Sequence, residues 1–358
     1  MQDPYPGLNP LLLEHLTWPE IEMEITRGTT TVVIPVGSIE QHGPHLPLLV
    51  DAARGTAIGL RVAESLGDAL VAPTIRVGCS EHHMGFAGTV SLRPETLEAL
   101  CRDYVVSLAR HGFLDLHFVP SHGGNFGPLQ GMLPRLRAAA AEVNPEVRVE
   151  VFADLLGVIA VWRWVVEEET GLGSRVGGHA DIAESSEMLH LLPWLVRVER
   201  AEKGRVGELD RKAVERIFSR GLRAVSPGGV LGDPRGMDGA LGAKLLDATS
   251  KLIAEWLRDR REGADVEEAE EPYPAPGVAV PGIPEGSIEA EPTDDDMKEI
   301  LKELEELDAR GFDFDDDSDD FGDEGGLDGD ILDEAESLED AFAHEHLDDD
   351  EDDEDRYG

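Results

Sequence analysis

Four apolar runs alternate with three amphipathic segments over the first half of the chain. The apolar runs, rich in β-branched and aliphatic residues, lie at 31–36, 69–75, 114–119 and 147–152. The segments between them carry apolar residues at helical spacing and lie at 52–65, 94–111 and 128–142. Pro94 and Pro128 suit first helical turns. The alternation predicts an α/β fold whose mainly parallel sheet has helices on both faces.

The acidic residues are concentrated in the last quarter of the chain. Residues 264–358 hold 40 Asp and Glu against 4 Lys and Arg, whereas residues 1–263 hold 35 against 27, so the net charge of −44 belongs mostly to the C-terminal part. Few large apolar residues lie between its charge runs. We therefore predict one folded domain over 1–263 and a largely disordered acidic tail over 264–358, with short helices at 294–307 and 332–342.

The sequence leaves three interpretations of this tail open. The first is a solubilising, charge-repelling segment, the second is a docking arm for a basic partner, and the third is an adaptation to high salt. The mild acidic excess of residues 1–263 is compatible with a salt-loving host.

The rest of the composition narrows the setting. Cys79 and Cys101 make no disulfide framework, which favours a reducing compartment. The N-terminus lacks a basic region followed by an apolar core, and the most apolar run, at 155–164, is too short for a membrane span and carries Arg163. The negative net charge disfavours a nucleic-acid partner. We expect a cytoplasmic protein that binds neither membranes nor nucleic acid.

Four side chains of the types that bind metals follow the first predicted strand within one loop: Glu40, His42, His45 and Asp51. Glu40 and His42 are two residues apart, so on an extended segment they point the same way and both reach one metal pair. Asp51 begins the next helical pattern and could bridge two ions with its two oxygens. Mixed oxygen and nitrogen ligands suit Zn²⁺, Mn²⁺ or Fe²⁺.

A second polar cluster, His122-Gly123-Gly124-Asn125, follows the predicted strand at 114–119. Ligands of open α/β sheets bind outside the carboxyl ends of the strands, so both clusters lie at one edge. A single histidine there is usually a hydrogen-bonded core residue, but the combined set predicts metal ligation. His45 is either a ligand or a support of the ligands. Asn125 either caps the following helix or holds a substrate carbonyl.

Two further polar segments belong to the same edge. In the segment at 177–186, Asp181 and Glu184 resemble a helix-capping pair, although Glu184 could equally deliver a carboxylate ligand at the start of a helix. His179 in the preceding loop could act as a general acid or base. In the segment Glu81-His82-His83, structural or interface roles are favoured, and Glu81 is kept as a candidate supporting residue.

These motifs resemble the creatininase (creatinine amidohydrolase) family over about residues 15–255. The resemblance is carried by their order and spacing, from Glu40-Gln41-His42-Gly43-Pro44-His45 through Asp51 and His122-Gly123-Gly124-Asn125 to His179 and Glu184-Ser185-Ser186. It implies a three-layer α/β sandwich, often assembled as a homo-oligomer such as a hexamer, with two divalent metal ions per chain. The implied chemistry is hydrolysis of a non-peptide or cyclic amide C–N bond of a small molecule by a metal-activated water.

The resemblance also implies residue roles. Glu40, Asp51 and His122 would hold one ion, His42 and Asp51 the other, and His179 would be catalytic. Creatininases proper have a glutamate ligand at the position of Gly124 and a tryptophan near residues 174–176, and this chain has neither. Glu184 is our candidate to complete the second metal shell.

These departures weaken creatinine as substrate and leave alternatives. Relatives with the Gly-Gly turn include a deformylase acting on a ribosylaminopyrimidine phosphate and a peptidase that trims the mycofactocin precursor. A hydrolase of a sugar-phosphate or inositol-type ring is a further candidate. A non-catalytic interaction protein that works through its acidic tail is the rival from another class, and it predicts little bound metal.

Overall fold

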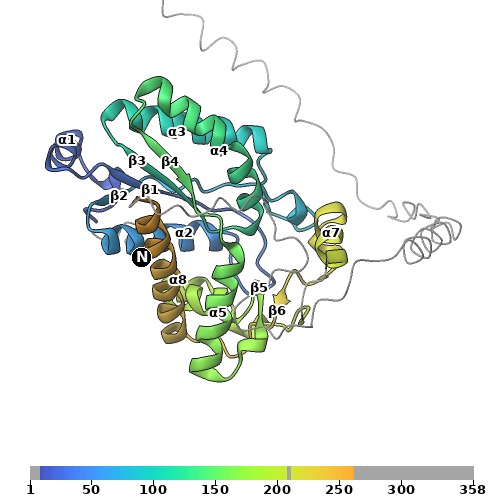
Figure 1. Cartoon of the computed structure of the whole chain (residues 1–358). Coiled ribbons are helices and arrows are strands. Elements are labelled where there is room, and N and C mark those ends of the chain that lie inside the picture. Colours follow the sequence, from blue (N-terminus) through green and yellow to red (C-terminus); the bar gives the residue numbers. More distant parts are fainter. Residues whose placement is uncertain (1–8, 208–210, 262–358) are drawn as a thin grey trace, which may run out of the picture. The chain divides into compact units, whose positions relative to one another are not determined.

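The computed structural model describes residues 9–207 and 211–261 (Figure 1). The predicted tail at 264–358, its two short helices and the boundary at residue 263 lie outside the described residues. Within those two ranges, every helix is too short or too polar to cross a membrane.

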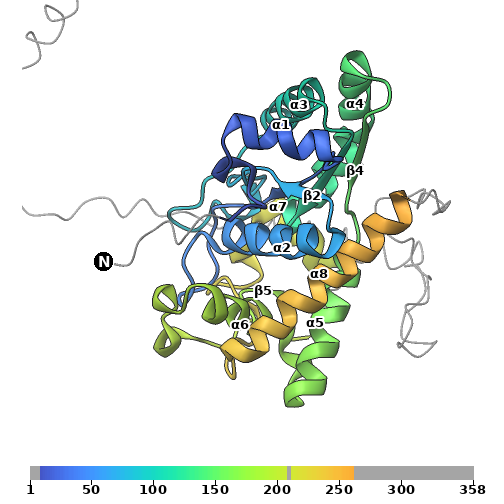
Figure 2. The ribbon, with the colours of Figure 1, turned by 90° about the vertical axis from the view of Figure 1, so that its left-hand side faces the viewer.

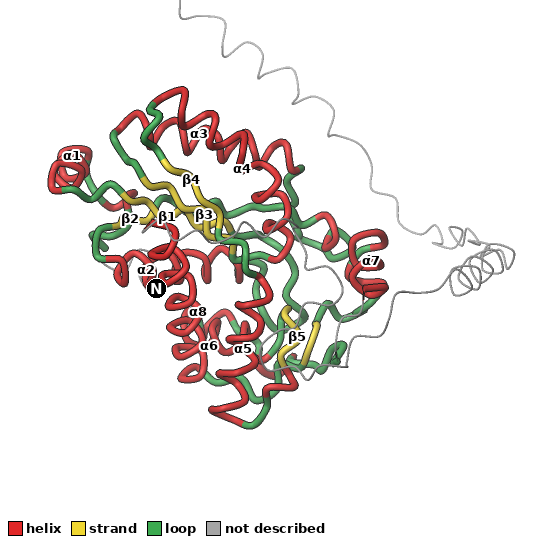
Figure 3. Tube along the Cα trace, in the orientation of Figure 1, coloured by secondary structure: helices red, strands yellow, loops and turns green. Residues whose placement is uncertain are grey.

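The main sheet has four parallel strands in the order β2-β1-β3-β4 (Figure 3). Their bounds are β1 Thr31–Val36, β2 Ala69–Val71, β3 Asp115–Pro120 and β4 Arg148–Val151. The predicted parallel α/β sheet is thereby confirmed. A second, two-stranded sheet pairs β5 (Val176–His179) with β6 (Leu231–Gly232) in antiparallel fashion.

Helices cover both faces of the main sheet, as Figures 1 and 2 show from two directions. One layer contains α1 (Trp18–Arg27), α3 (Pro94–His111) and α4 (Gly123–Val143), and the other contains α2 (Val50–Leu66), α5 (Leu155–Thr170) and α8 (Gly239–Arg261). A hydrophobic core lies on each face of the sheet, and alternate side chains of β1 point into the two cores: Val32 and Ile34 belong to one buried cluster and Val33 to the other. The sheet between two helical layers is a three-layer sandwich.

Two further helices complete the part of the fold that frames the strand ends. Helix α6 (Ile182–Leu191) packs against α2 and α8, and α7 (Arg211–Arg220) packs near the short 3-10 helix η2 (Glu81–His83).

Two predicted elements differ from the structure by several residues. The strand predicted at 69–75 ends at Val71; after Ala72 the next residue to donate to β1 is Ile75, whose N–H donates to the Pro35 carbonyl and which bridges to Val36. Helix α4 begins at Gly123 rather than at Pro128, which lies inside it. A proline there removes one backbone hydrogen bond, and the rest of the helix tolerates the loss.

The carboxyl ends of β1 and β3 form the natural crevice of this sheet. The two strands are neighbours, yet the helix that follows β1 covers one face and the helix that follows β3 covers the other. The order of strands reverses at such a point, and open α/β sheets bind ligands there. Val36 pairs with Pro120, and the Ser121 N–H donates to the Val36 carbonyl at 3.0 Å, so both following loops start side by side.

Candidate metal centre

Five side chains that the sequence marks as ligands come together at this crevice, and we call them the ligand cluster: Glu40, His42, Asp51, His122 and Glu184. They come from the loop after β1, the first turn of α2, the residue that precedes α4 and the first turn of α6. All five are buried. Their ligand atoms form two groups, each within 4.8 Å, with Glu40, Asp51 and His122 in one and His42, Asp51 and Glu184 in the other.

Asp51 belongs to both groups because its two oxygens face different histidines. Its Oδ2 lies 3.4 Å from His122 Nδ1, and its Oδ1 lies 3.5 Å from His42 Nε2. Glu40 Oε1 lies 3.3 Å from the same His122 nitrogen. The geometry therefore suits two cations that share one bridging carboxylate.

Both histidines of the cluster are oriented by backbone carbonyls. His122 Nε2 donates to the carbonyl of Cys79 at 3.1 Å, and His42 Nδ1 donates to the carbonyl of Glu40 at 3.2 Å. Metal-ligating histidines usually donate their remote N–H in this way, which fixes the ring and the tautomer. Each ring presents its other nitrogen to the carboxylates.

Several ligand atoms of the cluster are buried without a hydrogen-bond partner among the described residues. They are both carboxylate oxygens of Glu40, Nε2 of His42 and Oδ2 of Asp51. Buried polar atoms are nearly always paired, and buried carboxylates are costly without a cation. Divalent metal ions would satisfy all of these atoms, and the oxygen and nitrogen donors suit Zn²⁺, Mn²⁺ or Fe²⁺. The residues present thus fit the metal centre that the sequence implies.

The electrostatics of the cluster favour cations as well. Burial opposes a charge on His42, yet the carboxylates of Asp51, Glu184 and Glu40 raise the pKa of His42 to about 9. Burial likewise opposes a charge on His122, and the carboxylates of Glu40 and Asp51 raise the pKa of His122 well above its usual value. Without metal, therefore, protons occupy positions that face the carboxylates.

Glu184 combines the two roles that the sequence left open. Asp181 caps α6, because its Oδ1 accepts from the N–H of Ala183 at 2.8 Å. Glu184 Oε2 reaches back to the N–H of Ala180 at 2.6 Å, and the same oxygen lies 3.8 Å from His42 Nε2. Glu184 therefore makes a capping contact and faces the cluster at once.

His179 ends β5 and is followed by Ala180, which has a φ of 52° and is the only non-glycine residue with positive φ in the described ranges. His179 Nδ1 lies 3.8 Å from Glu40 Oε1, and these two residues form a third potential ligand group with His42. The His179 side chain is 10% exposed, more than any member of the ligand cluster. Burial and the neighbouring His42 lower the pKa of His179 to about 3, so its imidazole is neutral and can accept a proton.

Two residues that were not predicted as site residues, Gln41 and His83, contact this site. Gln41 places its side-chain nitrogen 2.9 Å from His179 Nε2 and 3.0 Å from His83 Nδ1. His83 Nε2 in turn lies 3.5 Å from Glu40 Oε2. Glu81, the residue of this segment that was singled out, is exposed, and His83 is buried and reaches the cluster instead. The available signal was the position of His83 after a strand at the same sheet edge.

His45 and Asn125 lie beside the cluster rather than in it. His45 Nε2 makes a hydrogen bond with the Ser185 hydroxyl at 2.8 Å. Asn125 Oδ1 accepts from the N–H of Cys79 at 2.9 Å, and its Nδ2 donates to the carbonyl of Gly37 at 2.9 Å. Asn125 is fully buried and tethers the two loops, so neither role considered for it, as a helix cap or as a substrate ligand, matches its contacts.

Gly124 leaves no space for a ligand side chain. A Cβ at this position would lie against the carbonyl oxygen of Cys79 and the imidazole of His122. The ring of His82 stacks on His122 here, with centroids 5.6 Å apart and planes inclined by 12°. The carboxylate in reach of His42 and Asp51 is instead that of Glu184.

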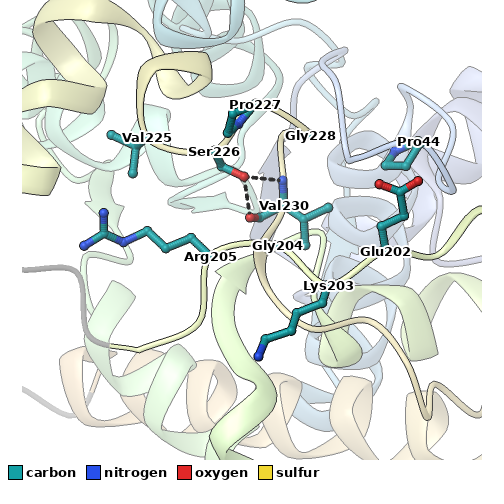
Figure 4. A pocket seen from close by; sticks show the side chains of 10 residues that line it. All are labelled: Pro44, Glu202, Lys203, Gly204, Arg205, Val225, Ser226, Pro227, Gly228 and Val230. Atoms are coloured by element: carbon teal, nitrogen blue, oxygen red, sulfur yellow. Dashed lines mark hydrogen bonds between the residues drawn. The ribbon is translucent and has the colours of Figure 1, made fainter.

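A cavity of about 340 Å³ adjoins the loop that carries His42 (Figure 4). Its lining includes Pro44 from that loop, Lys203 and Arg205, and the segment at 225–228 with Val230. Gly229 lies in the chain between the lining residues Gly228 and Val230, and its carbonyl accepts from Gln41 Nε2 at 3.1 Å. The same nitrogen of Gln41 faces His179. The cavity and the ligand cluster are therefore linked through one side-chain amide.

Comparisons with known proteins agree with this geometry. The sequence model of the creatininase family, described as creatinine amidohydrolase, matches residues 14–257. A mycofactocin precursor peptide peptidase of Mycobacterium ulcerans is 34% identical over 253 residues, which cover 67% of this chain and 86% of that protein. The creatinine amidohydrolase of Pseudomonas putida is 34% identical over 200 residues, covering 52% of this chain and 73% of that protein.

Solved structures give the same picture. The crystal structure of a creatinine amidohydrolase superposes with a TM-score of 0.59 at 27% identity and covers 70% of this chain and 97% of the other. The family match, the homologues and the fold agree with a cluster of groups that could hold divalent ions. The chain therefore belongs to the creatininase family and is an amidohydrolase that acts on amide C–N bonds.

Proposed function

We propose that this protein hydrolyses its amide substrate at a centre of two divalent ions. Glu40, Asp51 and His122 hold one ion, and His42, Asp51 and Glu184 hold the other. The observation that carries the proposal is the position of Asp51, whose two oxygens face the two histidines at 3.4 and 3.5 Å. When bound, the ions supply Lewis-acid polarisation of the amide carbonyl and a lowered pKa for the attacking water.

His179 is the proton carrier in this proposal. It is the most open of the grouped side chains, and its imidazole is neutral because burial and His42 lower its pKa to about 3. Its Nδ1 faces the cluster, whereas its Nε2 is engaged by Gln41. A neutral imidazole at that place can take a proton from the water and deliver it to the leaving nitrogen.

The metals and the setting follow from chemistry and from relatives. A mutant creatininase whose structure is named as the "Zn-Zn type" and a structure named "Creatininase Mn" are 28% and 26% identical to this chain, which supports Zn²⁺ or Mn²⁺. The donor set also admits Fe²⁺.

The cellular setting and the oligomeric state belong to the same proposal. The thiols of Cys79 and Cys101 are buried and free, which supports a reducing, cytoplasmic setting. We propose that the protein forms a homo-oligomer.

A second candidate substrate class is a peptide. The peptidase relative from M. ulcerans is matched over 86% of its length. The cavity beside Pro44 offers extra volume and two cationic side chains, Lys203 and Arg205, to a substrate longer than a small cyclic amide. Gly124 and the sequence Ser174-Arg175-Val176, which replace two features of creatininases proper, favour such a substrate over creatinine.

The proposal is tested by a substrate screen on the full-length chain after metal removal. Small amides, lactams, formamides and short peptides are assayed with Mn²⁺, Zn²⁺ and Fe²⁺ added separately, beside the matched variant Asp51→Ala. We expect turnover that needs added metal and is lost in the variant. Turnover that survives chelation, or that Asp51→Ala retains, would refute the two-metal assignment.

A further inference from the structure

Arg54 is a fully buried cation next to the ligand cluster that the reaction as described does not use. It follows Asp51 by one helical turn of α2, and its residue exposure is 1%. Its guanidinium lies 4.7 Å from the ring centroid of Trp162, which is also buried. Arginine in such a place needs anionic partners, because the burial of a lone charge is costly.

Arg54 faces three carboxylates: those of Glu184 and Glu187, one turn apart on α6, and that of Asp51, whose Oδ1 lies 3.7 Å from Arg54 Nη1. Its Nη1 donates to Glu184 Oε1 at 3.0 Å, and its Nε donates to Glu187 Oε2. The same Nη1 donates to the carbonyl of Ser121 at 3.2 Å, just before His122. One side chain thus connects α2, α6 and the loop after β3, the three elements that deliver Asp51, Glu184 and His122.

The two carboxylate oxygens of Glu184 have different partners. Oε1 accepts a hydrogen bond from Arg54, while Oε2 lies 3.8 Å from His42 Nε2 and accepts from the N–H of Ala180. With one oxygen occupied by the guanidinium, the carboxylate has its other oxygen directed at the group of His42 and Asp51. Without Arg54, only the N–H of Ala180 would hold the terminal torsion of the Glu184 side chain.

Glu187 explains how Arg54 itself is held. Its carboxylate is fully buried and accepts from the guanidinium Nε, and among the residues that the structure describes it belongs to none of the potential ligand groups. A planar guanidinium with two donors fixed on two carboxylates keeps one orientation, which a point charge such as an ammonium cannot reproduce.

We propose that Arg54, anchored by Glu187, is a positioning residue that directs Glu184 toward the second metal ion. The inference rests on the two-ion centre proposed above. It predicts that Arg54 controls the affinity of one ion, the one in the group of His42, Asp51 and Glu184, and leaves the ion of the other group in place.

The test is a Mn²⁺ titration of the metal-free, full-length protein, with free Mn²⁺ followed by electron paramagnetic resonance. Wild type should bind about two ions per chain, whereas Arg54→Lys should keep one and bind the second about 10- to 100-fold more weakly. Arg61→Lys is the matched control, because Arg61 lies on the same helix but pairs with the exposed Asp247, and it should bind as wild type.

A double-mutant cycle separates positioning from general destabilisation. With Glu184→Gln already present, Arg54→Lys should change the affinity for the second ion by less than about 2-fold, because the residue it acts through has been removed. Glu187→Gln, which keeps Arg54 and Glu184, should weaken the second ion in the same direction and serves if Arg54→Lys does not fold. Equal affinities in wild type and Arg54→Lys, or full additivity in the cycle, would overturn the inference. Fewer than two ions in wild type would overturn the two-ion centre itself.

Discussion

The side-chain nitrogen of Gln41 lies 2.9 Å from Nε2 of His179, within hydrogen-bonding distance. The N–H of Gly43 donates to the other end of the amide, Gln41 Oε1, at 2.9 Å, which fixes the amide with its nitrogen toward the histidine. The same amide nitrogen lies 3.0 Å from His83 Nδ1 and 3.1 Å from the Gly229 carbonyl, so its two hydrogens are divided among three neighbours. Nδ1 of His179, on the other side of the ring, faces Glu40.

Substitutions of Gln41 should therefore act on the proton carrier without removing metal. Gln41→Leu should lower kcat about 5-fold, because the loss of one hydrogen bond of ~1 kcal/mol raises the activation barrier by that amount. Gln41→Glu presents an anion to the ring, which should raise the pKa of His179 and move the acidic limb of the pH–rate profile to higher pH. Pre-steady-state and pH–rate measurements check both variants. Loss of bound metal in Gln41→Leu would contradict this division of roles.

His179→Ala should separate proton transfer from metal binding. We expect kcat to fall at least ~100-fold, within the range for loss of a general acid or base, while metal content stays at the wild-type level. His190→Ala, an exposed histidine on α6, is the control and should be silent. His179 also forms a potential ligand group with Glu40 and His42. If the metal content of His179→Ala falls together with kcat, His179 is a metal ligand rather than the proton carrier.

Metal binding should release protons near neutral pH. Despite burial, the carboxylates of Asp51, Glu184 and Glu40 raise the pKa of His42 to about 9, and the pKa of His122 is raised as well, so both rings are protonated in the metal-free protein at pH 7. A ligand nitrogen must give up its proton, so affinity should fall as the pH is lowered below about 9. Calorimetry in two buffers of different ionisation heat measures the release, and identical heats would contradict it.

The same shifts fix the sign of a stability effect. A histidine whose folded pKa lies above its unfolded value stabilises the fold fully below about pH 6.5, and this contribution is lost as the pH rises toward the folded pKa. The melting temperature of the metal-free protein should therefore decrease between about pH 6.5 and about pH 9, and added Mn²⁺ should reverse the decrease.

The cavity beside Pro44 makes the peptide hypothesis testable. Replacing both Lys203 and Arg205 by alanine should raise KM about 3- to 10-fold for a peptide with an acidic terminus, as expected for partly exposed charge contacts. The kinetics of a small neutral amide should not change, and higher salt should reduce the difference. Lys244→Ala, which breaks the exposed pair with Glu169, is the control. Equal effects on both substrates would remove the cavity from substrate binding.

The sequence predicts the sheet well because its signals are local. The run at 31–36 is strand β1 and the segment at 94–111 is helix α3, both with the predicted bounds. The signal misleads at two places, since the apolar run at 69–75 continues past the end of β2 and Pro128 conceals the early start of α4.

The ligand cluster is predictable for a related reason. Each member lies at the end of a predicted strand or at the start of a predicted helix, and parallel strands bring such ends to one edge. The residues around it are harder to find. Arg54 and Glu187 sit on helices, where single charged residues usually mark a solvent-exposed face, and only packing of α2 against α6 reveals that both are buried. His83 joins the site through contacts with Glu40 and Gln41 that no short-range pattern encodes.

The most direct test of the account is the metal content of the purified full-length chain, measured by inductively coupled plasma mass spectrometry after loading with Mn²⁺ and removal of free metal. The shared position of Asp51 predicts about two ions per chain in wild type and a loss of both in Asp51→Ala. A wild-type chain that retains no divalent metal, or an Asp51→Ala chain that retains both ions, would contradict it.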